Sequence, residues 1–143
     1  MQRPGFPARG TAPLKLQPDR LDVPAISGYG FGWVSVGSER IGHSLVLGSQ
    51  GERFDWNCAG FDDLGPAHFE RLATLDTELV IFGSGERLRF VPPAWLAPLM
   101  ARRIGLETMD TRAACRTYNI LAGEGRRVVC ALLLEGGGAA DSR

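Results

Sequence analysis

The spacing of apolar residues changes near Gly65 and divides the chain into two parts. In the first part, bulky side chains alternate with glycine or polar residues over 28–36, and Gly37-Ser38 is typical of a turn. Residues 39–47 then predict a partner strand, and residues 54–56 a third short strand. The opening part is therefore expected to consist of β-hairpins.

After Gly65 the apolar positions recur at helical spacing, between runs that are continuously apolar. Pro66 suits the first turn of a helix that this pattern extends to Leu75. Residues 78–82 form an apolar run stopped by Gly83-Ser84-Gly85, which is typical of a strand buried on both faces. Strand and helix therefore alternate from this point on.

The last third of the chain continues this alternation. Pro92-Pro93 opens a second helix, which Gly105 closes, and its shared apolar face carries Trp95, Leu96, Leu99 and Met100. Residues 106–109 predict a brief strand, and Asp110 or Thr111 caps a third helix that ends around Gly123. Residues 128–134 are almost all apolar and predict a central strand. The order indicates a layered α/β sheet with right-handed crossovers.

Composition narrows the class of protein. A chain of 143 residues fits one domain, expected over 21–134, with a disordered leader over 1–20 and a disordered tail over 135–143. The 16 basic and 16 acidic side chains balance, which excludes the basic surplus of a dedicated nucleic-acid binder. No apolar run is long enough to span a membrane, although peripheral association stays open. Three cysteines without paired spacing indicate reduced thiols rather than a disulfide framework.

Familiar catalytic patterns are missing from the sequence. Gly28-x-Gly30-x-Gly32 lacks the spacing of a dinucleotide-binding loop and precedes a strand pattern rather than a helix. Gly83-Ser84-Gly85 follows a buried strand, where α/β sheets bind ligands, but no Gly-Lys-Ser follows, so a tight turn is the simpler interpretation. His43 and His68 have no metal-ligand spacing with the cysteines. No catalytic residue, cofactor or metal is predicted.

The helix that starts at Asp110 carries the most specific pattern. Arg112, Arg116 and Asn119 form one polar line on it. Two arginines in such a line suit recognition of a carboxylate or phosphate, while the alternative is a solvated face with local ion pairs. Cys115 beside Arg116 suggests a redox-sensitive thiol, although a buried cysteine is the commoner outcome.

The same helix carries a family resemblance. The motif runs Met109-Asp110-Thr111-x-Ala113-Ala114-Cys115-Arg116-Thr117-Tyr118-Asn119-x-Leu121, followed by Glu124-Gly125-Arg126-Arg127-Val128. It resembles the signature of a small family that includes mitochondrial complex I assembly factor three and many bacterial and archaeal proteins. The resemblance extends to residues 28–30, 44–45, 56 and 82–86, in the right order, and so covers about 21–134.

This resemblance implies a three-layer α/β fold with a mixed sheet, additional β-hairpin structure and a single domain. It brings no enzymatic activity, cofactor or catalytic residue. The best-understood member acts by association during assembly of respiratory complex I. The leader does not resemble a mitochondrial import signal, so the resemblance implies a cytoplasmic bacterial protein.

Two functions follow as hypotheses. The first is a non-catalytic interaction or accessory factor that binds another protein, in respiratory-complex or membrane-protein assembly. The second is a small-molecule or anion-binding domain, or a cryptic enzyme, with a pocket between the Gly83–Glu86 turn and the Asp110 helix. The residues predicted to form a ligand or partner site are Gly83, Ser84, Gly85, Asp110, Arg112, Cys115, Arg116 and Asn119.

Overall fold

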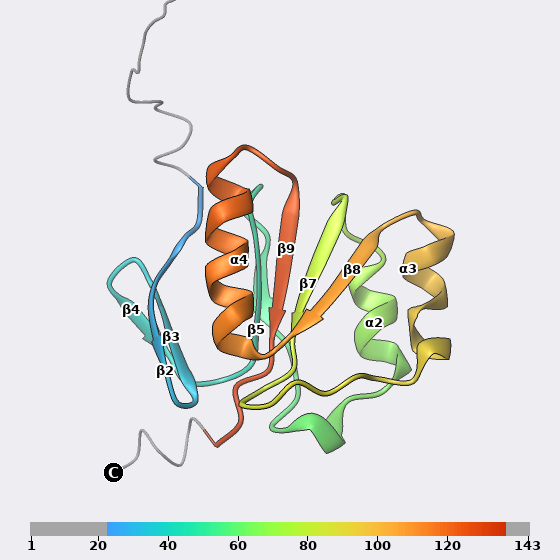
Figure 1. Ribbon diagram of the computed structural model, residues 1–143, viewed down its shortest axis with the longest axis horizontal. Coiled ribbons are helices and arrows are strands. Elements are labelled where there is room, and N and C mark those ends of the chain that lie inside the picture. The colour runs from blue at the N-terminus through green and yellow to red at the C-terminus, as the bar shows by residue number, and fades with distance from the viewer. Residues whose placement is uncertain (1–22, 137–143) are drawn as a thin grey trace, which may run out of the picture.

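A mixed five-stranded sheet lies at the centre of the molecule (Figure 1). The computed structural model describes residues 23–136. In spatial order the central strands are β6 (Arg53–Asp55), β5 (Leu45–Gly48), β9 (Val128–Leu132), β7 (Leu79–Gly83) and β8 (Gly105–Met109). β9 runs parallel to β7 and antiparallel to β5, which makes the sheet mixed.

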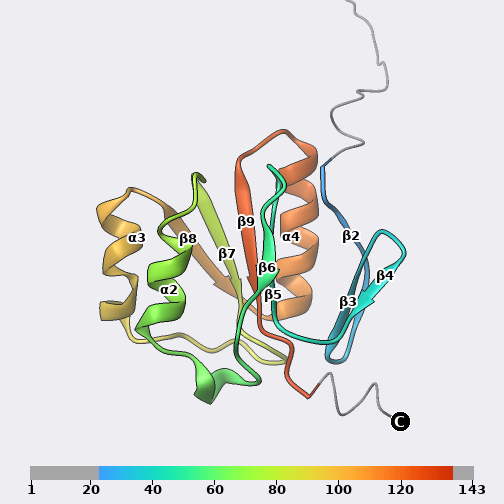
Figure 2. The same ribbon diagram turned by 180° about the vertical axis from the view of Figure 1, so that it is seen from behind.

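Helices cover both faces of this sheet. One face carries α4 (Thr111–Gly123) and the other carries α2 (Pro66–Leu72) and α3 (Ala97–Ala101), as Figures 1 and 2 show from opposite sides. Two short 3₁₀ turns, η1 (Phe61–Asp63) and η2 (Pro93–Leu96), precede α2 and α3. The predicted three-layer α/β fold with a mixed sheet is therefore confirmed.

A separate three-stranded antiparallel sheet packs beside α4. It consists of β2 (Ile26–Gly30), β3 (Trp33–Val36) and β4 (Glu39–Ile41). This is the additional β-hairpin structure that the sequence predicts, and it places α4 between two sheets.

The apolar pattern of β9 explains its central position. Val128, Cys130 and Leu132 pack in the core on the α4 side. Side chains at the intervening positions pack in the second core, under α2 and α3. Because side chains alternate along a strand, only a strand covered on both faces has an uninterrupted apolar sequence. Burial of each such side chain stabilises the fold by roughly 1.5–3 kcal/mol.

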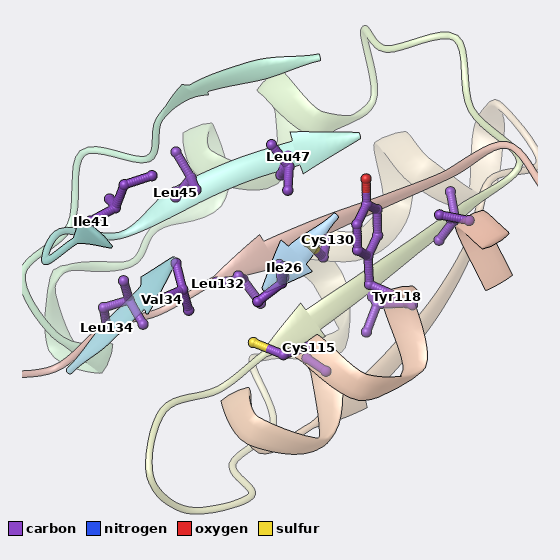
Figure 3. Close-up of a cluster of buried hydrophobic side chains, with 14 residues drawn as sticks. Ile26, Val34, Ile41, Leu45, Leu47, Cys115, Tyr118, Cys130, Leu132 and Leu134 are labelled. Carbon is purple, nitrogen blue, oxygen red and sulfur yellow. The ribbon is translucent and has the colours of Figure 1, made fainter. Parts of the chain in front are cut away.

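The N-terminus of α4 is capped as predicted. The Asp110 carboxylate accepts a hydrogen bond from the Ala113 N–H (3.0 Å), which satisfies one of the unpaired amides of the first turn. From this start, Ala114, Cys115 and Tyr118 fall on one buried face. Figure 3 shows Cys115 and Tyr118 in the same core as side chains of β2, β5 and β9.

The predicted single strand over 39–47 is wrong. β4 ends at Ile41 in one sheet and β5 begins at Leu45 in the other. Ser44 fixes the crossing point, because its buried hydroxyl accepts from the Leu134 N–H (3.0 Å) and its carbonyl accepts from the Trp56 N–H (3.0 Å). The segment completes a hairpin with β3 over Glu39–Ile41 and then passes to the central sheet.

Two helices also differ from the prediction. α2 ends at Leu72 rather than Leu75. The helix expected after Pro92-Pro93 is a 3₁₀ turn followed by a short α-helix, on which Leu99 is buried but Met100 is 71% exposed. The change from 3₁₀ to α winding alters which positions share a face.

The end of α3 is formed by a different residue from the one predicted. Arg103 adopts the left-handed conformation (φ 58°) that terminates the helix, and Gly105 is already the first residue of β8. The predicted leader over 1–20 and residues 137–143 of the predicted tail lie outside the described residues. Within the described range 23–136, no helix has both the length and the apolar character required to cross a bilayer.

Candidate functional site

The turn after β7 is organised by the hydroxyl of Ser84. Ser84 Oγ donates to the carbonyl of Arg87 (2.7 Å) and accepts from the N–H of Arg89 (3.0 Å). The Ser84 N–H also donates to the carbonyl of Met109 (2.9 Å), which joins the turn to the end of β8. The buried serine therefore fixes the path of the chain where it leaves the sheet.

This turn contacts the first residue of α4 directly. The Gly85 N–H donates to Thr111 Oγ1 (2.9 Å), and the Thr111 N–H donates to the Gly85 carbonyl (2.8 Å). Thr111 Oγ1 donates in turn to the carbonyl of Leu133 (2.8 Å). A Cβ on Gly83 would lie 3.0 Å from both Thr111 Cα and Thr111 Oγ1 and 3.1 Å from Ala114 Cβ, so the end of β7 packs closely against the first turn of α4.

The polar line on α4 is divided among three neighbouring segments. Arg112 forms an ion pair with Glu86 (3.6 Å), and Arg116 Nη1 donates to the Tyr29 hydroxyl (3.1 Å) at the surface. The Asn119 side chain is bonded to the backbone of Ile26. These three side chains connect the helix to its surroundings and do not converge on one point.

Cys115 is fully buried within the α4 core. Burial raises the pKa of its thiol to about 12, and the nearby charge of Arg116 opposes this increase only in part. The nucleophilic form of cysteine is the thiolate. At neutral pH this side chain is therefore a protonated, packed thiol, and the geometry gives the redox hypothesis no support.

Three large apolar side chains are exposed at the end of the molecule where β7 and β9 terminate. Phe31 is 52% exposed in the turn between β2 and β3, and Leu88 and Phe90 are 53% and 68% exposed in the segment after β7. Both segments lie at the same end in Figures 1 and 2. We refer to Phe31, Leu88 and Phe90 as the end surface.

An ion pair anchors the part of the end surface that carries Leu88 and Phe90. Arg89, between Leu88 and Phe90, donates to the carboxylate of Glu135 and to the carbonyl of Ser84 (3.0 Å). Its guanidinium also lies 4.5 Å from the ring centroid of Phe61. Burial disfavours the charged form of Glu135, but hydrogen bonds from Arg89 and from the Phe61 N–H outweigh it and lower the pKa of this carboxyl. Leu88 and Phe90 thus flank a residue that is anchored to the rest of the fold.

The sequence interpretation missed the end surface. Its only signal is the alternation Arg87-Leu88-Arg89-Phe90 between a glycine turn and Pro92-Pro93, which does not reveal the side that faces solvent. Glu135, assigned from sequence to the tail, is part of the same arrangement. Segments far apart in sequence build this region, so no local pattern marks it.

Comparison with known proteins supports the resemblance noted in the α4 motif. Residues 26–133 match the model of the family described as "Protein of unknown function (DUF498/DUF598)". A bovine protein, NADH dehydrogenase [ubiquinone] 1 alpha subcomplex assembly factor 3, is 34% identical over 87 residues, which are 59% of this chain but only 47% of that protein. The chain thus spans about half the length of that relative.

Two bacterial proteins match over more of their length. An uncharacterised protein of Rhodobacter capsulatus is 32% identical over 108 residues, or 76% of this chain and 82% of that one. A protein from Bordetella parapertussis, whose crystal structure is known, is 36% identical in sequence to this chain. The two folds superpose with a TM-score of 0.74, and the match covers 79% of this chain and 97% of that one. The match in sequence and the match in fold agree. The chain belongs to the DUF498/DUF598 family and is similar in sequence to complex I assembly factor 3.

Proposed function

We propose that this protein is a non-catalytic accessory factor that binds a protein partner during the assembly of a membrane complex, on the cytoplasmic side of a bacterial membrane. The observation that carries the proposal is its kinship with a protein named as an assembly factor of a respiratory complex. An assembly factor acts by association, so its function requires a surface for a partner rather than a reactive centre.

The end surface has the properties that such an interface requires. Two of its three side chains are phenylalanines, and large aromatic side chains supply much of the binding energy at protein interfaces. The Arg89–Glu135 pair holds Leu88 and Phe90 in place, so little ordering is needed when a partner binds. The proposed occupant is an apolar segment of a subunit that is not yet embedded in its complex.

Site-directed photo-crosslinking in the native cell tests this proposal. A photoreactive phenylalanine analogue at position 90 is expected to crosslink to a subunit of a membrane complex, identified by mass spectrometry. In a separate affinity pull-down with the tagged chain, the double variant Leu88→Ser/Phe90→Ser is expected to lose capture of that subunit, because it removes two apolar contacts from the interface.

Met100→Ser and Ile120→Ser are the matched controls. Both residues are apolar and exposed, at 71% and 60%, but they lie on α3 and α4 rather than in the end surface. These variants are expected to retain capture. Equal loss in the controls and the double variant, or no reproducible protein partner at position 90, would count against the proposal.

A further inference from the structure

The outer edge of β8 is an open edge of the central sheet. β8 is the last strand in the sheet order, and its only strand neighbour among residues 23–136 is β7 (Figure 1). The two strands run parallel in a continuous register, from the pair Leu79 and Gly105 to the pair Gly83 and Met109. A strand at the edge of a sheet presents unpaired N–H and C=O groups, which can pair with another extended chain.

The hydrogen bonds at both ends of β8 fix the direction of its backbone groups. The Gly105 N–H donates to the Glu78 carbonyl (3.0 Å), at the start of the strand. The Met109 carbonyl accepts from the Ser84 N–H (2.9 Å), at its end. The backbone groups of Gly105 and Met109 therefore face β7.

The residues between these two ends alternate in direction. In a parallel ladder, every second residue bonds to a given neighbour, so the backbone groups of Glu107 also face β7. Those of Leu106 and Thr108 face the opposite way. Within the described range, neither Leu106 nor Thr108 forms a backbone hydrogen bond with another segment. Two donors and two acceptors are thus spaced along the edge as the next strand of a sheet requires.

The other three sheet edges are shorter or already partly paired. β4 and β6 have three residues each, and an ion pair between Arg53 and Glu39 (2.8 Å) joins them. β2 is irregular between Ile26 and Gly28, and Asn119 bonds to both backbone groups of Ile26. Short strands and bulges are common protection of sheet edges. β8 has five residues, a regular register and no proline, so it is the edge best able to accept another strand.

The charge on β8 selects among the possible partners. Glu107 is exposed and forms no ion pair with the described residues. A second copy of this chain would use all four outward groups only in the antiparallel register that sets Leu106 opposite Thr108. That register places two Glu107 carboxylates opposite each other, and like charges there are destabilising. A different chain with a basic side chain at this position has the complementary charge.

We propose that the outer edge of β8 binds an extended segment of another protein, which joins the central sheet as an antiparallel strand with a basic side chain opposite Glu107. Leu106 and Thr108 bind the backbone of this segment, and Glu107 selects its sequence. Strand addition of this kind obtains affinity from main-chain hydrogen bonds and specificity from alternate side chains. The edge contains no residue of the end surface, so the inference does not rest on the proposed assembly role.

Amide hydrogen exchange of the full chain tests this proposal, with the peptide acetyl-Ser-Thr-Val-Lys-Val-Thr-Ser-amide as the probe. In the free chain, the amides of Leu106 and Thr108 are expected to exchange rapidly and that of Glu107 slowly, because only the last is bonded within the sheet. A saturating concentration of the peptide is expected to slow exchange at Leu106 and Thr108 and to leave Glu107 unchanged. The same peptide with glutamate in place of lysine is expected to bind about tenfold more weakly.

Two substitutions of Thr108 separate the backbone from the side chain. Thr108→Pro removes one outward N–H without removing a bond to β7, and proline is tolerated at such positions of edge strands. This variant is expected to bind the peptide about tenfold more weakly or worse. Thr108→Ala keeps the N–H and is expected to bind within about threefold of the parent chain.

Two charge reversals test the selecting role of Glu107. Glu107→Lys is expected to weaken binding of the lysine peptide about tenfold. Glu70→Lys makes the same change at an exposed residue of α2 and is expected to leave binding unchanged.

Three results would overturn the proposal. The first is slow exchange at Thr108 in the free chain, which would mean that the edge is already covered, by a second copy if the protection depends on protein concentration. The second is the absence of saturable peptide binding. The third is equal weakening in Thr108→Pro and Thr108→Ala. If Thr108→Pro does not fold, exchange in the parent chain and binding to Glu107→Lys decide the question.

Discussion

The side-chain amide of Asn119 forms two hydrogen bonds with the backbone of Ile26. Asn119 Oδ1 accepts from the Ile26 N–H (2.9 Å), and Asn119 Nδ2 donates to the Ile26 carbonyl (2.8 Å). One side chain on α4 therefore pairs with the edge of β2 as a neighbouring strand would. This pairing joins the three-stranded sheet to the rest of the molecule, together with the bond from the Tyr118 hydroxyl to the Pro24 carbonyl (2.6 Å).

Asn119→Asp is expected to destabilise the protein by about 1–3 kcal/mol. A carboxylate still accepts from the Ile26 N–H, but it cannot donate to the Ile26 carbonyl and places two oxygens against each other. Urea denaturation of the variant and the parent chain measures the difference in the free energy of unfolding.

Ile120→Ala is the control for this substitution. Ile120 is the next residue of α4 and is 60% exposed, so its truncation is expected to change the free energy of unfolding by no more than about 0.5 kcal/mol. If Asn119→Asp were equally neutral, Asn119 would have no structural role, and the ligand-anchoring role predicted from sequence would regain support.

Gly83→Ala and Gly123→Ala are expected to change stability in opposite directions. A Cβ on Gly83 would meet Thr111 Cα at 3.0 Å and Ala114 Cβ at 3.1 Å, so overpacking should destabilise the fold by about 1–3 kcal/mol. Gly123 is the last residue of α4 and has open space around the added Cβ, so alanine there should stabilise by about 0.4–1 kcal/mol. Thermal unfolding of both variants checks the two signs; destabilisation of equal size would contradict this account.

The sequence predicts the central layers well because their signals are local. The apolar runs of β7 and β9 and the Asp110 cap of α4 each determine a structure within a few neighbouring residues. Residues 39–47 locally predict a single strand, but the chain leaves one sheet after Ile41 and enters the other at Leu45. The crossing is fixed by the hydrogen bond between Ser44 and Leu134, 90 positions away. Periodicity holds no information about such distant contacts.

The candidate site was harder to predict than the fold. Arg112, Arg116 and Asn119 lie along one side of α4, as their spacing predicts. However, Tyr29, the partner of Arg116, and Ile26, the partner of Asn119, come from a sheet whose position the sequence does not reveal. The open edge of β8 is likewise invisible before the order of the strands is known. In both cases the residue type is informative only after its surroundings are assembled.

The Arg89–Glu135 pair is expected to make stability depend on acidic pH. The folded pKa of Glu135 lies below its ordinary value of 4.5. The pair therefore contributes stability above that value and loses it as pH falls through the folded pKa. Glu135→Gln, at a side chain only 27% exposed, should lower the free energy of unfolding by about 1 kcal/mol at neutral pH.

Denaturation of the parent chain and of Glu135→Gln at a series of acidic pH values checks this prediction. The difference between the two proteins should shrink as the carboxylate becomes protonated. A difference that stays constant from neutral to strongly acidic pH would show that the charge of Glu135 does not stabilise the segment under the end surface.

The buried thiols are expected to make stability depend on alkaline pH in the opposite sense. Burial raises the pKa of Cys58 to about 11 and that of Cys115 to about 12, from an ordinary value of 9.0. Each thiol contributes stability below 9.0 and loses it as pH rises through the folded pKa. For the fully buried Cys115 the loss is up to about 1.4 kcal/mol per pH unit. Cys115→Ala should therefore show a shallower loss of stability above pH 9.0 than the parent chain.

Thiol labelling gives an independent measurement: the half-buried Cys58 should react before Cys115 and Cys130, and all three should react rapidly only after unfolding. Rapid labelling of Cys115 in the native protein would contradict this account and would restore the redox hypothesis for that residue.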